Sequence, residues 1–78
     1  MTRTLEAMVR NGPESLMRIT GLMKRRGCEV KKLSLELDEA SSMSKLVITL
    51  GANEMEMDNI IMQMRRFQDV MDLAEYNR

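Results

Sequence analysis

The chain has 78 residues, and its twelve Lys and Arg side chains balance its twelve Asp and Glu side chains. This length predicts one domain over residues 1–78, with a thin hydrophobic core. The zero net charge argues against a phosphate-binding surface, and no apolar run is long enough for a transmembrane helix. We therefore expect no nucleic-acid partner and no membrane partner.

The residue types present rule out several kinds of chemistry. The chain has no histidine and a single cysteine, Cys28, whereas zinc sites and Ser–His or Cys–His nucleophilic pairs need more of these residues. No glycine-rich phosphate-binding loop occurs, so we expect neither an enzyme nor a metal site. A lone cysteine cannot close an intramolecular disulfide, which fits a reducing, cytoplasmic compartment.

The first predicted element is a strand over residues 4–10, where apolar and polar side chains alternate. The turn Asn11-Gly12-Pro13 ends this strand, and Pro13 suits the first turn of a helix. The helix expected from Glu14 onward carries its apolar residues on one stripe: Leu16, Ile19, Leu22 and Met23. Gly27 then predicts a left-handed cap after the helix.

A second strand is expected over residues 28–37, where leucines alternate with polar residues. Val30 is out of phase with these leucines, so either it faces the opposite side or a bulge at Lys31-Lys32 resets the register. The polar segment 38–42 predicts a turn into a third alternating strand, and the two strands form an antiparallel hairpin. Residues 69–76 predict a last strand, which follows a second helix with its stripe at Met57, Ile60, Ile61, Met64 and Phe67.

The order strand, helix, strand, strand, helix, strand predicts an α+β, ferredoxin-like βαββαβ fold. Right-handed crossovers would place both helices on one face of a four-stranded antiparallel sheet, with the first and third strands in its centre. The second and fourth strands are then edges. Because edge strands are either covered or paired, we expect a homodimer joined through the second strands.

This fold hosts many functions, so particular residues must discriminate among them. RNA-binding domains of this shape carry aromatic residues on the two central strands. Phe67 and Tyr76 are the only aromatic residues of this chain, and neither lies on those strands. An RNA-binding module of the same fold is therefore the weaker alternative, and it would bind in a strongly salt-dependent manner.

Motifs along nearly the whole chain are more specific. Leu16, Arg18 and Ile19 lie in the first helix, Arg26-Gly27 follow it, and Asp69-Val70 stand near the end. In order and spacing these residues resemble the ACT domain of the small regulatory subunit of acetolactate synthase, also called acetohydroxyacid synthase. The chain length resembles the short, single-domain type of this subunit.

The resemblance implies a non-catalytic subunit that binds a large catalytic subunit using thiamine diphosphate, flavin and magnesium. Together the two subunits would make the first common step of valine, leucine and isoleucine synthesis, and no cofactor would belong to this chain. The alternative is a free-standing ACT-type sensor, which would bind another small amino acid without any partner.

The resemblance also implies an effector site between two protomers. Carried over residue by residue, it falls on the first loop of one protomer and on the start of the second strand of the other: Asn11, Gly12, Pro13, Glu14 and Ser15, with Cys28, Glu29 and Val30. Glu14 stands where the valine-sensitive pattern has glycine, and Glu29 where it has asparagine. Both carboxylates would repel the carboxylate of an amino acid. We therefore expect a weak effector at most, and activation without tight valine inhibition.

Overall fold

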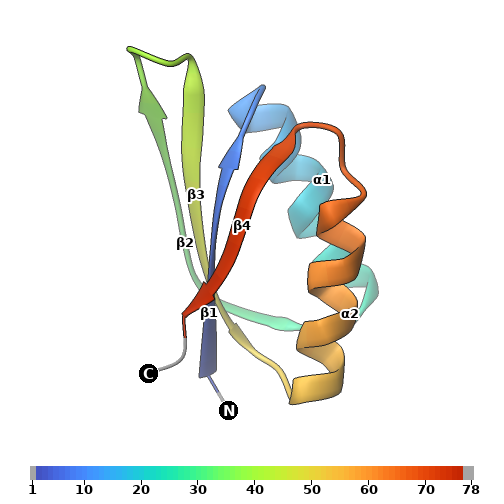
Figure 1. The fold of residues 1–78 in the computed structure, drawn as a ribbon. Coiled ribbons are helices and arrows are strands. Elements are labelled where there is room, and N and C mark those ends of the chain that lie inside the picture. Colours follow the sequence, from blue (N-terminus) through green and yellow to red (C-terminus); the bar gives the residue numbers. More distant parts are fainter. Residues whose placement is uncertain (1, 77–78) are drawn as a thin grey trace.

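The computed structural model describes residues 2–76 and contains the expected elements in the expected order. They are β1 (Thr2–Val9), α1 (Gly12–Arg25), β2 (Glu29–Asp38), β3 (Met43–Gly51), α2 (Glu54–Arg65) and β4 (Val70–Tyr76). The strands form one antiparallel sheet in the order β2-β3-β1-β4, so β1 and β3 are central as predicted. Both helices lie against one face of this sheet (Figure 1). The predicted α+β, ferredoxin-like fold is confirmed.

The hydrophobic core lies between the helices and the sheet. Side chains alternate between the two faces of a strand, and the residues of β1 and β3 that face the helices are buried. The predicted stripe of α1 is confirmed, because Ile19, Leu22 and Met23 are buried and Leu16 is half-buried. The fully enclosed residues of the core are Leu5, Val9, Ile19, Met23, Leu46, Ile48, Leu50, Met57, Ile60 and Met64.

Phe67 departs from its predicted place on the second helix, because α2 ends at Arg65. The Phe67 N–H donates to the Met64 carbonyl at 3.1 Å, a bond of the tighter 3₁₀ spacing that ends the helix. The Val70 N–H then donates to the Phe67 carbonyl at 3.1 Å. Phe67 nevertheless packs against the core, from the connection that leads into β4.

The ends of α1 follow the expected backbone chemistry. The helix starts two residues before Glu14, at Gly12, with Pro13 in its first turn. Asn11 caps it in a left-handed conformation with φ of 49°, which Asn tolerates better than most residues. Gly27 has φ of +72°, as the predicted left-handed cap requires.

The register of β2 shows on which face of the sheet Val30 lies, a point that the sequence leaves open. The pairing of β2 with β3 shifts between Val30 and Lys32, so Lys31 is the extra residue of a bulge. Val30 therefore lies opposite Leu50, on the face that also carries the leucines of β2.

No helix within residues 2–76 is long and apolar enough to cross a membrane.

Candidate functional site

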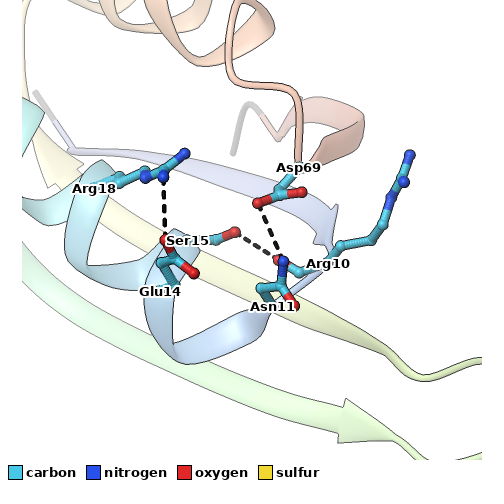
Figure 2. Close-up of polar contacts among 6 residues, drawn as sticks. All are labelled: Arg10, Asn11, Glu14, Ser15, Arg18 and Asp69. Carbon is cyan, nitrogen blue, oxygen red and sulfur yellow. Dashed lines mark hydrogen bonds and ion pairs between the residues drawn. The ribbon is translucent and has the colours of Figure 1, made fainter.

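The loop between β1 and α1 carries the first group of predicted site residues (Figure 2). The Ser15 side chain is buried, and its hydroxyl donates to the Arg10 carbonyl at 2.6 Å. The Arg10 N–H donates to the Asp69 carbonyl at 2.8 Å, and Asn11 Nδ2 lies 3.5 Å from the Asp69 carboxylate. These contacts tie the loop to the segment that enters β4. The role of Asp69 becomes visible only in the structure, because 58 residues separate it from Asn11.

Gly12 has a packing role at this loop. It is buried beside the second half of β2 and the start of β3, and a Cβ atom built on it would lie 2.6 Å from Ser44 Oγ. The same atom would lie 3.3 Å from Leu35 Cδ2. A residue without a side chain therefore lets the N-terminus of α1 approach the sheet this closely.

Pro13 and Glu14 lie on the exposed side of the same turn. Arg18 Nη2 lies 3.1 Å from Glu14 Oε1, and the two side chains are 55% and 60% exposed. An exposed pair one helical turn apart contributes only ~0.3–0.5 kcal/mol to stability. The Glu14 carboxylate thus lies along the outer surface of α1, with its charge partly balanced by Arg18.

The second group of predicted residues lies where the chain enters β2. Cys28 is half-buried and packs against the core. Burial, reinforced by the negative charge of Glu56, raises the pKa of its thiol, and Arg26 partly offsets this shift. Glu29 is exposed and pairs with Lys31 at 3.1 Å.

Within one chain, the structure does not bring these two groups together. They lie at opposite ends of α1, a helix of 14 residues that spans about 20 Å at 1.5 Å per residue. Only two copies of the chain could combine them. The loop before α1 offers backbone N–H groups at a helix start, which suit the binding of an anion.

The open face of the sheet carries a polar cluster that the sequence does not predict. The Tyr76 hydroxyl donates to the Glu6 carboxylate at 2.9 Å, and Lys45 Nζ lies 3.6 Å from the same carboxylate. The hydrogen bond to Glu6 raises the pKa of the Tyr76 phenol. A shallow cavity of about 570 Å³ lies beside this cluster and is lined by Thr2, Thr4, Glu6 and Tyr76. No local motif signals these contacts, because 70 residues separate Tyr76 from Glu6.

Comparison with known proteins assigns the family. Residues 5–72 match the family described as the AHAS small subunit-like ACT domain. The chain belongs to this family. The match includes the predicted site residues of both groups, from Asn11 to Ser15 and from Cys28 to Val30.

Relatives of this ACT domain carry a consistent name. The acetolactate synthase small subunits of Mycobacterium avium and Mycobacterium leprae are 30% and 28% identical to it over 74 residues, which are 95% of this chain and 44% of each relative. The probable acetolactate synthase small subunit of Archaeoglobus fulgidus is 25% identical over 75 residues, 96% of this chain and 47% of the relative. The chain thus spans about half the length of these relatives.

Solved structures agree with the ACT fold. The acetolactate synthase small subunit of Thermotoga maritima superimposes with a TM-score of 0.84 at 19% identity, over 99% of this chain and 48% of that one. The ACT domain of a GTP pyrophosphokinase from Chlorobium tepidum gives a TM-score of 0.80 at 10% identity, over 97% of both chains. At such low identities these likenesses show the fold alone.

Proposed function

We propose that this ACT domain is a non-catalytic regulatory subunit of acetolactate synthase. It binds the large catalytic subunit, which carries the thiamine diphosphate, and raises its activity in branched-chain amino acid synthesis. The observation that carries this proposal is the family match over residues 5–72, to which relatives named acetolactate synthase small subunit add support. The lack of histidine fits a subunit that contributes no acid–base catalyst of that kind.

The active form is a homodimer joined through β2. This strand is an edge of the sheet, and all of its residues except Leu35 are exposed. On its helix-facing side the Leu33 and Leu37 side chains remain 39% and 64% exposed. An exposed strand edge with a row of large apolar side chains is suited to pairing with a second chain.

Antiparallel pairing of two β2 strands would assemble the effector site that the family resemblance implies. In such a pair, the start of one strand lies beside the end of the other. Gly12 packs against Leu35, in the second half of β2. The loop that contains Asn11 and Ser15 would therefore lie at the same side of the interface as Cys28 and Val30 of the partner subunit.

Valine binds weakly at this site, and the complex is not inhibited by it. Glu14 and Glu29 each add a negative charge beside one of the two loops of this site, and this charge disfavours the approach of an amino-acid carboxylate. Arg18 and Lys31 balance these carboxylates only in part, because each ion pair is exposed and weak.

Reconstitution tests the proposed function. The purified chain is mixed with the large acetolactate synthase subunit of the same genome, and both co-elution and the rate of acetolactate formation are measured. We expect a stable complex and a higher rate than that of the large subunit alone, with an unrelated ferredoxin-like domain as the control. The absence of both co-elution and activation would contradict the proposal. Calorimetric binding of an amino acid to the chain alone would favour the free-standing sensor.

A further inference from the structure

We propose that the side of the two helices facing away from the sheet docks the large catalytic subunit, through an apolar centre and a basic rim that meets acidic residues of the partner. This outer helix face carries Met17 and Gly21 of α1 and Met55 and Met62 of α2. The inference rests on the proposed function and names the surface that carries it. Its basis is a set of exposed residues that no contact within the chain explains.

Three exposed methionines form the apolar centre of the outer helix face. Met17, Met55 and Met62 are 75%, 73% and 52% exposed. Met55 and Met62 are seven residues apart, so they lie on one side of α2. The other exposed large apolar side chains of residues 2–76 belong to β2 and β4. Methionine is flexible and polarizable, and such a side chain adapts to the surface of a partner.

The methionines of the two helices belong to one surface, because α1 and α2 lie side by side and run in opposite directions (Figure 1). The start of α2 lies near the end of α1, since the charge of Glu56 acts on the Cys28 thiol. The end of α2 lies near the start of α1, since Asp69 contacts Asn11. The core occupies the opposite side of both helices.

Gly21 leaves a flat position on this surface. It lies one turn after Met17, on the same side of α1. Glycine is a poor residue inside a helix, and no contact within the described chain requires it here. A Cβ atom at this position would meet nothing closer than Arg25 Nη1, at 3.8 Å. A glycine at such a position allows a second molecule to approach the helix backbone closely.

The rim of the outer helix face is predominantly basic. The exposed basic residues of segments 12–26 and 54–66 are Arg18, Lys24, Arg25, Arg26, Arg65 and Arg66. The exposed acidic residues of the same segments are Glu14, Glu54 and Asp58. Of these basic residues, only Arg18 forms an ion pair within residues 2–76, and its partner is Glu14. Like charges repel across an interface, so this face favours an acidic partner over a second copy of itself.

The arrangement matches the anatomy of a protein interface. Interfaces have an apolar centre and a polar rim, and they are enriched in methionine and arginine. The homodimer proposed above uses β2 at the edge of the sheet, so the outer helix face stays open in it. The matching surface of the catalytic subunit carries apolar side chains at its centre and Asp or Glu around them.

Polar substitution of two methionines tests the apolar centre. Met17→Ser combined with Met62→Ser should raise the dissociation constant for the large subunit at least ~10-fold. Met71→Ser is the matched control, because Met71 is 49% exposed but lies on β4, and it should bind as the native chain does. Urea titration checks that both variants keep the native stability, as exposed positions should. A double variant that binds as tightly as the native chain would overturn the proposal.

Gly21→Gln tests the close approach of the partner to α1. The variant should be at least as stable as the native chain, because glutamine is the better helix former and its Cβ atom meets no close neighbour. It should nevertheless bind the large subunit at least ~10-fold more weakly, because the new side chain fills the space that the partner occupies. Native affinity in this variant would overturn the close approach at Gly21.

Charge reversal tests the basic rim. The affinity of the native chain for the large subunit should fall as the salt concentration rises, because salt screens the attraction between opposite charges. Lys24→Glu combined with Arg25→Glu should weaken binding at low salt and remove much of this salt dependence. Salt dependence that persists unchanged in the variant would overturn the role of this part of the rim.

The outcomes separate this inference from the proposed function. A native chain that neither binds nor activates the large subunit overturns both. Binding and activation that stay at native levels in all these variants overturn the outer helix face alone. Light scattering of the chain alone tests the other occupant. Assemblies larger than a dimer that Met17→Ser with Met62→Ser breaks down to dimers would assign this face to a second copy and overturn the inference.

Discussion

Gly12 and Ser44 lie so close together that a methyl group on Gly12 would stand 2.6 Å from the Ser44 hydroxyl oxygen. Gly12 is the first residue of α1, and Ser44 lies near the start of β3. Their contact sets how closely the N-terminal end of the helix approaches the sheet. It thereby positions the loop that carries one half of the proposed effector site.

Gly12→Ala should destabilise the fold by ~1–3 kcal/mol, as overpacking of a close contact does. Gly21 is the matched control, because a Cβ atom there would meet nothing closer than 3.8 Å. Gly21→Ala should stabilise α1 by about 0.5–1 kcal/mol, since glycine is the poorer helix former. Urea titrations at one protein concentration compare the two variants, and a Gly12→Ala chain as stable as the native chain would show that Ser44 moves away freely.

Ile19→Ala should lower the free energy of unfolding by ~2–5 kcal/mol, because the side chain is fully buried and its removal leaves a cavity. Arg25 lies on the exposed side of the same helix, and Arg25→Ala should cost well under ~1 kcal/mol. Urea titration measures both changes. Similar losses in the two variants would contradict the burial of Ile19.

The charge of the proposed effector site can be changed by Glu14→Gly combined with Glu29→Asn. Removing both carboxylates should let an amino-acid carboxylate approach the start of α1, so the double variant should gain sensitivity to valine. The reconstituted complex is assayed with and without millimolar valine, for the native chain and for the variant. Strong inhibition of the native complex would contradict the role given to these two glutamates.

Cys28 should react slowly with iodoacetamide near neutral pH. Burial and the charge of Glu56 raise the pKa of its thiol, so the reactive thiolate is scarcer at a given pH than in an unfolded chain. The alkylation rate should therefore rise at a higher pH in the folded chain than in a urea-unfolded control. Glu56→Gln removes the nearby charge while glutamine can still close the capping box with Asn53. The pKa of the thiol should fall in this variant, and a profile of rate against pH that does not move would exclude an effect of Glu56.

Local patterns were sufficient for the elements of this fold. The alternation around Leu5 and Ala7 and the helical stripe around Ile19 follow from side-chain directions within one strand or one helix. The α2 stripe was right up to Met64. The helix ends before Phe67, because a 3₁₀-type hydrogen bond closes its last turn. The spacing of apolar residues does not predict such an ending.

By itself, the sequence determined the order of the elements, the stripe of α1, the stripe of α2 as far as Met64, the turn residues and the resemblance to the acetolactate synthase small subunit. These features depend on backbone geometry and on residues close together in the chain. Tertiary structure alone decided that a bulge at Lys31 turns Val30 toward the leucine face, that Gly12 lies against Ser44 and that Tyr76 bonds Glu6. Each of these depends on strand register and on contacts between segments far apart in sequence, which only the packed sheet and helices specify.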